Sequence, residues 1–194
     1  MNLSFGLEVI ATEANLFTWG MLKATWSELL LPYTEIVLGP TPQLIDMDTK
    51  EPLNDTDMIA DHLVDGTRLF KFSLAVSTGM VMFAELNRLS AYENGEKEVI
   101  HSEGKNKDLD LLDSIARQWE TAGMFYSLES YIPGRSSYEV KLFVTLAAAI
   151  ARLCSGYVLW TDGGFDLAEG LYTPDEILQL RPNDSLWLGF DDQT

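Results

Sequence analysis

The interval at which apolar residues recur changes along the chain, and each change marks a different element. Over residues 3–9 apolar and polar side chains alternate, which is typical of a strand with one buried face. From residue 16 to residue 30 apolar residues recur at every third or fourth position instead. We therefore expect a helix there, capped by Asn15 or Thr12 and ended by Pro32.

The clearest helix lies further along the chain and is apolar on every side. Ser136 stands three residues before Glu139, a spacing that lets the two side chains cap each other's backbone amides at a helix start. Residues 142–151 carry no charge, and a helix without a polar face belongs in a protein interior. The uncharged run is about half of the roughly 20 residues that span a bilayer. We therefore expect a buried central helix over residues 137–154.

Signals for a strand and a capped helix follow this central helix. Gly156 suits the left-handed position after a helix end, and the apolar residues 157–160 predict a short buried strand. Thr173 and Pro174 are typical of an N-cap and a first helical residue, and Pro182 ends the helix that they begin.

The middle of the chain predicts an antiparallel meander followed by another helix. Strands are expected over residues 67–76, 80–89 and 96–101, and an asparagine–glycine pair at residues 94–95 is a strong hairpin signal. Beyond a loop that contains glycine and lysine, an apolar stripe with acids in its first turn predicts a helix from Asp108 onward.

Together these elements predict one α+β domain that spans residues 1–194. We expect a mostly antiparallel sheet of about five or six strands, with helices packed on one face around the buried central helix. A chain of this length buries about 70% of its unfolded surface on folding. It therefore needs no disulfide or metal ion to stabilise a core.

The composition fits a globular cytoplasmic protein. Hydrophobic residues make up 46% of the chain and aromatic residues 11%, which distinguishes it from a disordered polypeptide. Cys154 is the single cysteine, and at the end of an apolar helix it is more typical of a small buried residue than of a nucleophile. The first residues show neither the basic region nor the apolar stretch of a signal peptide, so we expect a cytoplasmic location.

Acidic residues outnumber basic ones by more than two to one. Thirty acids and 13 bases give a formal net charge of −17 at pH 7, so we expect neither a direct nucleic-acid partner nor a membrane partner. Residues 1–66 contain eleven of the acids and only two of the bases. This excess either keeps the protein soluble or provides a binding face for a basic protein.

The acids are most dense between residues 43 and 66. A calcium loop of the EF-hand type needs glycine at its sixth position, and a loop that began at Asp46 or Asp55 would lack it. We expect Thr56 to cap a short helix that runs through Asp65, with aspartates spaced four residues apart on one side.

That side of the helix is either solvated or a docking ridge for lysine and arginine. If it is a ridge, Met47, Met58 and Ile59 are its nearby apolar anchors. The candidate contacts with a basic partner are the acids of this segment: Asp46, Asp48, Glu51, Asp55, Asp57, Asp61 and Asp65.

The chain contains no motif that identifies an enzyme. His62 and His101 each lack a second histidine at metal-ligand spacing. Ser136 is better explained as a helix cap than as a hydrolase nucleophile, and no phosphate-binding glycine loop is present. We therefore expect no catalytic residue, no cofactor and no metal ion.

A pair of carboxylates provides an alternative from a different class. Asp162 and Asp166 lie around a glycine turn that follows a buried strand, which would hold them close enough for acid–base chemistry or for a divalent cation. The simpler interpretation is a turn cap and a solvated acid. A small hydrolase or metal-dependent enzyme would form its pocket from five residues: Trp160, Asp162, Asp166, Glu169 and Tyr172.

The leading hypothesis is an acidic binding protein that neutralises a basic protein partner. A bacterial immunity protein or antitoxin that inhibits a toxin would fit, because a concentrated negative field steers association with a basic surface. A third possibility is an oligomer-forming adaptor that pairs strands through an exposed edge of the meander over residues 67–101.

Overall fold

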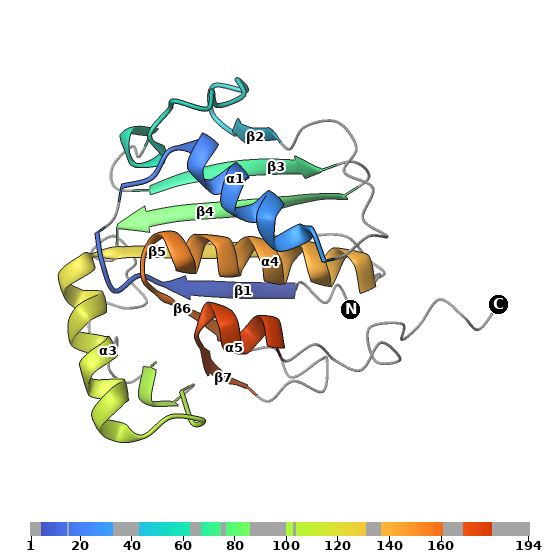
Figure 1. Cartoon of the computed structure of the whole chain (residues 1–194). Coiled ribbons are helices and arrows are strands. Elements are labelled where there is room, and N and C mark those ends of the chain that lie inside the picture. Colours follow the sequence, from blue (N-terminus) through green and yellow to red (C-terminus); the bar gives the residue numbers. More distant parts are fainter. Residues whose placement is uncertain are drawn as a thin grey trace.

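The chain forms one antiparallel sheet with helices packed against it (Figure 1). The structure is a computed structural model and describes residues 5–14, 16–32, 43–62, 67–74, 77–85, 100–102, 104–130, 137–160 and 169–179. The seven strands are β1 Phe5–Ile10, β2 Gln43–Asp46, β3 Thr67–Leu74, β4 Ser77–Glu85, β5 Met124–Ser130, β6 Tyr157–Trp160 and β7 Gly170–Tyr172. The described helices are α1 Trp19–Leu30, the short 3₁₀ helix η1 Ile59–His62, α3 Leu109–Ala122, α4 Ser137–Leu153 and α5 Pro174–Gln179.

The strands lie in the order β2-β3-β4-β5-β1-β6-β7, and every neighbouring pair is antiparallel. This confirms the predicted α+β class, with seven strands instead of five or six. The two ends of the sheet are its short strands, β2 and β7, which contain four and three residues. Such short segments carry too few residues for a period of two to be recognised in the sequence.

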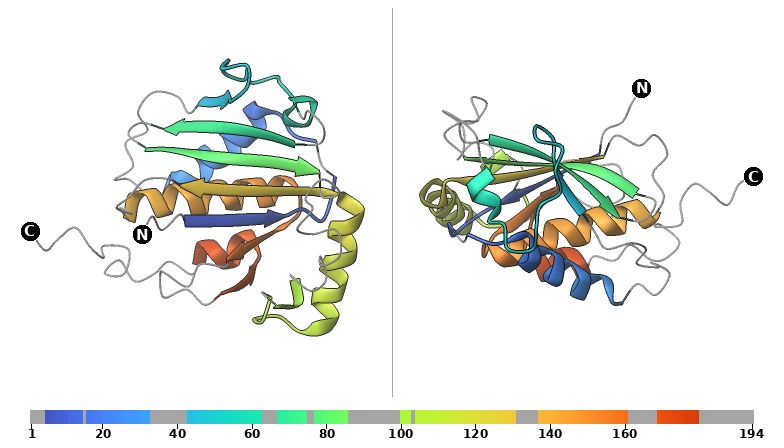
Figure 2. Two further views of the ribbon diagram at one scale, coloured as in Figure 1. Left: turned by 180° about the vertical axis from the view of Figure 1, so that it is seen from behind. Right: turned by 90° about the horizontal axis from the view of Figure 1, so that it is seen from above.

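Neighbouring residues of a strand point to opposite sides, and at β1 both faces of the sheet pack against helices. Val9 of β1 belongs to the larger apolar cluster with α1, α4 and α5, whereas Ile10 belongs to a smaller cluster with α3. Figures 1 and 2 show α4 lying along the sheet between α1 and α5, with α3 at one end. The helices therefore form one main layer, as expected, and α3 adds a second contact on the opposite face.

The helix α4 is the centre of the larger cluster, as its sequence predicts. Every side chain from Leu142 to Ala151 is buried, and α4 contacts α1, α5, β1 and β6. From Lys141 to the end of α4, the one buried polar side chain is that of Thr145, whose hydroxyl donates to the carbonyl oxygen of Lys141 at 2.7 Å and accepts from Nε1 of Trp26 in α1 at 3.0 Å. One hydroxyl therefore joins the two helices without leaving a buried polar group unpaired.

The end of α4 differs from its prediction. The left-handed conformation falls on Ser155, with φ 50°, and the amide of Gly156 donates to the carbonyl oxygen of Ala151 at 2.7 Å, as in a Schellman motif. Gly156 is needed for a different reason. A Cβ atom there would lie 2.2 Å from the carbonyl oxygen of Ile10, because the chain leaves α4 pressed against β1.

Two further expectations about local structure are wrong. Thr18 caps α1, and its hydroxyl accepts from the amide of Met21 at 3.2 Å. The predicted cap Thr12 contacts the end of α4 instead, where its hydroxyl donates to the carbonyl oxygen of Ser155. Residues 100–102 are helical where a strand end was expected, and Ile100 is buried beside α3.

Other predicted features agree with the structure or lie outside it. Asp108 caps α3 by accepting from the amide of Leu111, and Thr173 and Glu176 cap each other's amides at the start of α5. The strand β5 was not foreseen, although a glycine that ends α3 precedes it. The cap at Ser136, the turn at residues 94–95 and the stop at Pro182 lie outside the described residues.

Two glycines test whether space or backbone conformation limits substitution. We expect Gly156→Ala to lower the free energy of unfolding by about 3 kcal/mol, because its methyl group meets a backbone carbonyl that is fixed in the sheet. Gly123 has φ 68° and open space around its missing Cβ. Gly123→Ala should therefore cost only about 1–2 kcal/mol from backbone strain. Urea denaturation measures both, and equal losses would contradict the close contact at Gly156.

Candidate interaction surface

The acidic segment begins with a tight hairpin at one edge of the sheet. The amide of Asp46 donates to the carbonyl oxygen of Glu51 at 3.0 Å, and that of Leu53 donates to the carbonyl oxygen of Leu44 at 2.8 Å. The Asp46 side chain is only 2% exposed, and its carboxylate accepts from the amides of Asp48 and Thr49. Asp46 therefore closes the turn from inside and lies out of reach of a partner's surface.

The next part of the segment is attached to the start of α1. The amides of Trp19 and Gly20 both donate at 3.0 Å, to the carbonyl oxygens of Asp57 and Asp55 respectively. A Cβ atom on Gly20 would lie 2.7 Å from the Asp55 oxygen, so the two backbones are in close contact. These bonds satisfy two of the four amides that a helix start leaves unpaired.

The expected acidic helix is therefore absent from the described part of this segment. The carboxylate of Asp57 accepts from the backbone and side-chain amides of Asn54 and so closes a turn before η1. The only helix here is the single turn of η1, which begins at Ile59. Asp57 lies before that turn and so takes no part in the predicted helical row of aspartates at four-residue spacing, whereas Asp65 lies outside the described residues.

The candidate contacts fall into distinct groups. Asp48, Glu51 and Asp55 are exposed, whereas Asp46 is buried and Asp57 is half-buried. The side chain of Asp55 is 65% exposed and forms an ion pair with Lys23 of α1. The side chain of Asp61 and all of Asp65 lie outside the described residues.

The predicted apolar anchors are not the apolar groups that this surface exposes. Ile59 is buried, and Met47 and Met58 are half-buried. Leu16, Met21 and Leu31, in and around α1, are exposed large hydrophobic residues instead. The low polarity of α1 is visible in its sequence, where Lys23 and Glu28 are the only charges.

The aromatic residues of the pocket in the alternative enzyme hypothesis are core residues. Trp160 and Tyr172 are both buried in the larger apolar cluster beneath the helices. Glu169 is exposed and pairs with Lys105 at 3.9 Å. Asp162 and Asp166 lie outside the described residues. Among the residues that the structure describes, no three metal-ligating side chains are grouped.

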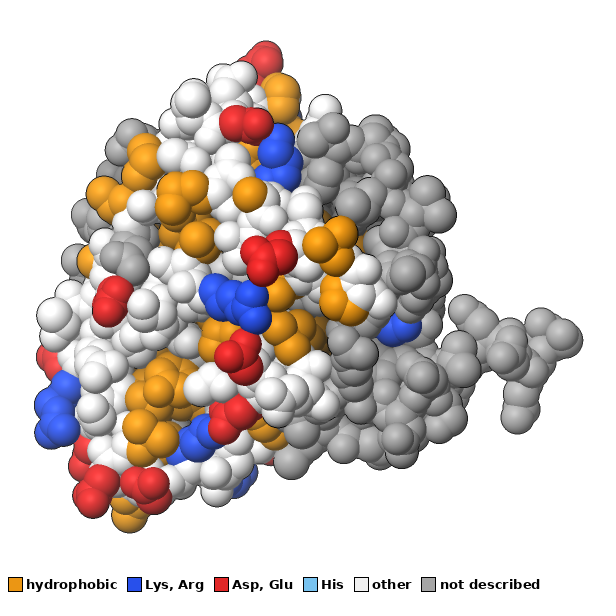
Figure 3. All heavy atoms as spheres, viewed as in Figure 1, with side chains coloured by type: hydrophobic (Ala, Val, Ile, Leu, Met, Phe, Trp, Pro, Cys, Tyr) orange, Lys and Arg blue, Asp and Glu red, His pale blue; other side chains and the backbone are white. Residues whose placement is uncertain are grey.

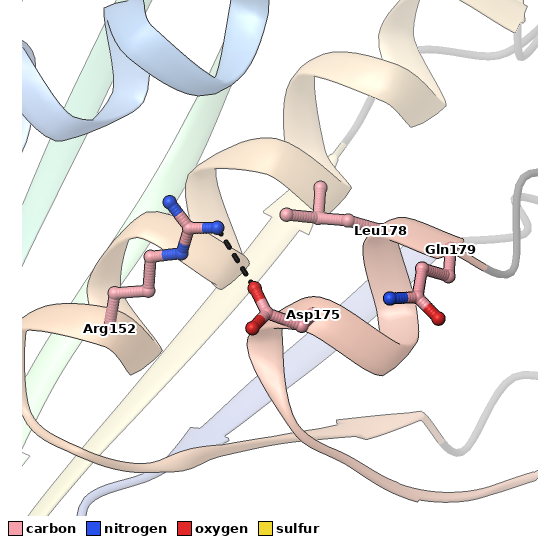
Figure 4. Close-up of a pocket in the computed structure, with 4 residues that line it drawn as sticks. All are labelled: Arg152, Asp175, Leu178 and Gln179. Carbon is pink, nitrogen blue, oxygen red and sulfur yellow. Dashed lines mark hydrogen bonds and ion pairs between the residues drawn. The ribbon is translucent and has the colours of Figure 1, made fainter.

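A different pocket, of about 400 Å³, opens between the end of α4 and α5 (Figure 4). It is lined by Arg152, Asp175, Leu178 and Gln179. The guanidinium group of Arg152 donates to the Asp175 carboxylate at 2.9 Å, so the two charges on its wall are paired with each other.

The expected exposed edge of the meander is not at its two described strands. The strand β3 lies between β2 and β4, and β4 lies between β3 and β5. At one end of the sheet, residues 51–53 cover the outer side of β2. At the other end, the side-chain amide of Asn106 both donates to and accepts from the backbone of Leu171 in β7, each time at 2.9 Å.

The single cysteine is a core residue. Cys154 is fully buried in the larger apolar cluster. Burial is the main cause that raises the pKa of its thiol to about 12, with a smaller contribution from the Glu13 carboxylate, so the thiol stays protonated at neutral pH. Burial also raises the pKa of Tyr126 well above its usual value. Neither group is suited to react at the surface.

Comparison with known proteins gives no relative from which a function could be carried over. No family model, curated protein or solved structure matches the chain. No helix in the described part of the chain is both long enough and apolar enough to cross a membrane.

The two roles of the acids can be separated by stability. We expect Asp46→Ala to lower the free energy of unfolding by about 1–3 kcal/mol, because two backbone amides of the turn lose a charged acceptor. Glu51→Ala removes an exposed carboxylate five residues away and should change stability by less than about 0.5 kcal/mol. Urea denaturation compares them, and an unchanged stability of Asp46→Ala would contradict its role in the turn.

Proposed function

We propose that this protein binds and neutralises a basic protein partner, in the manner of an immunity protein or antitoxin that inhibits a toxin. The proposal rests on charge, and one observation carries it: exposed acids project from a segment whose backbone is held by hydrogen bonds to the sheet edge and to α1. A fixed array of charge loses little conformational entropy when it binds a surface of opposite sign.

The basic residues near these acids do little to offset the negative electrostatic field of the acids. Residues 1–66 contain only Lys23 and Lys50. The ammonium group of Lys23 pairs with Asp55, and that of Lys50 donates to the carbonyl oxygen of Met47. These contacts compensate negative charge only at single points. The net charge of −17 remains, and it would accelerate encounters with a basic protein.

The first experiment uses the complete protein as bait. The basic proteins of its source cell are first collected on a cation exchanger. The immobilised bait is incubated with this fraction at low salt, and bound proteins are then eluted with a salt gradient. We expect one basic protein in stoichiometric amount, released as salt screens the charges. Recovery of no basic protein by a folded bait would overturn the proposal.

A charge reversal at the hairpin tests whether these acids contribute. Asp48→Lys combined with Glu51→Lys should weaken the affinity for the recovered partner by about tenfold at low salt, and by much less at high salt, where exposed charges are screened. The matched control is Asp110→Lys combined with Glu120→Lys, which makes the same change in net charge at exposed positions of α3. Isothermal titration calorimetry measures both, and equal effects would show that only net charge matters.

A further inference from the structure

We infer that the exposed side of α1, together with the adjacent Asp55, is the docking face for this partner. The inference rests on the proposed function and adds the location of the contact and the chemistry of the partner's surface. That surface should present an apolar patch or pocket bordered by lysine and arginine.

The exposed residues of α1 lie along one stripe. Met21, Ala24, Glu28 and Leu31 are spaced three or four residues apart, and each is exposed, so they follow one side of the helix. Met21 is 48% exposed and Leu31, just after the helix, is 72% exposed. A surface helix normally turns polar residues to solvent. Here three of the four solvent-facing residues are apolar.

The stripe and the acidic segment form one continuous surface. Gly20 lies next to Met21, and its amide donates to the carbonyl oxygen of Asp55. Lys23, one turn into the helix, forms an ion pair with the Asp55 side chain. Figure 3, drawn from the same side as Figure 1, shows apolar side chains on the helix-covered face with acidic and basic groups among them. An apolar centre with charged groups near its border is the usual arrangement of a protein interface.

The buried side of α1 keeps this surface in place. Trp26 is fully buried, and its indole nitrogen donates to Thr145 of α4. Leu22, Leu29 and Leu30 belong to the same apolar cluster. Because one side of the helix is fixed in the core, the other side is presented to a partner without rearrangement, which lowers the entropic cost of binding.

Charge selects a basic protein over a second copy as the occupant. A second copy would bring another net charge of −17 to the same face, and like charges across an interface oppose association. Glu28 and Asp55 are exposed acids at this face. A partner that buries Met21 and Leu31 therefore gains most if it places lysine or arginine near these carboxylates.

A pair of substitutions at one position tests both parts of the inference. Ala24 is exposed in the middle of the stripe, and lysine and glutamate are both good helix formers that carry opposite charges. With the partner recovered by the low-salt capture, we expect Ala24→Lys to weaken the affinity at least tenfold. Ala24→Glu should bind at least five times more tightly than Ala24→Lys, because a basic surface attracts the added carboxylate and repels the added ammonium.

The apolar contact has its own variant and control. Leu31→Ser should weaken binding about tenfold, as expected for a central apolar contact. Leu109, 68% exposed at the start of α3 on the opposite face of the sheet, provides the matched control. Leu109→Ser should change the affinity by less than about twofold. Circular dichroism and the unfolding midpoint establish that each variant is folded before calorimetry.

The outcomes separate this inference from the proposed function. If a basic partner is captured and the variants of Ala24 and Leu31 bind as tightly as the original chain, the docking face is wrong and the proposed function stands. If Ala24→Lys and Ala24→Glu weaken binding equally, the face is in contact but the basic border is wrong. If no basic partner is captured, the function and the docking face both fail.

Discussion

The rest of the structure depends on the burial of α4, a helix that has no polar side to turn toward water. Its residues from Leu142 to Ala151 must be covered on all sides, and β1 and β6 cover one of them. The helices α1 and α5 then cover two others. Transfer of so many apolar side chains from water is the largest favourable contribution to folding available to this chain. The hydrogen bond between Trp26 and Thr145 adds specificity, because it is satisfied in only one register of α1 against α4.

This constraint also fixes the surface. Because α1 must cover α4, its tryptophan and leucine side chains point inward, which leaves Met21, Ala24 and Glu28 exposed on the other side. The backbone of Asp55 and Asp57 then completes the hydrogen bonds at the start of α1. The position of the acidic segment therefore follows from the packing of the core, although its charges contribute nothing to that core.

Signals that are local in sequence predict local structure well here. The start of α5 depends on Thr173 and Glu176, which satisfy each other's amides within one turn, and the burial of α4 follows from its composition. The failures concern bonds between distant segments. Gly156 is set by its contact with Ile10, and the backbone carbonyl of Asp57 is set by the start of α1, so no nearby residue indicated either role. The strand β5 was not predicted, although its sequence contains a strand signal. Met124, Tyr126 and Leu128 are large apolar or aromatic residues at every second position after Gly123, the glycine that ends α3.

The candidate surface was only half predictable for the same reason. The excess of acids is a property of composition, whereas the division of those acids between turn caps and exposed groups is a property of the fold. Asp46, Asp57 and Asp108 accept backbone hydrogen bonds and stabilise the turns or helix start in which they lie. Glu28 and Glu51 are exposed, and among the described residues their side chains cap no turn or helix end. A net charge of −17 opposes compaction through self-repulsion. Exposed acids such as Glu28 and Glu51 add to that repulsion without stabilising the fold. A basic partner bound on the exposed side of α1 would offset the repulsion, and this would contribute favourably to the free energy of binding.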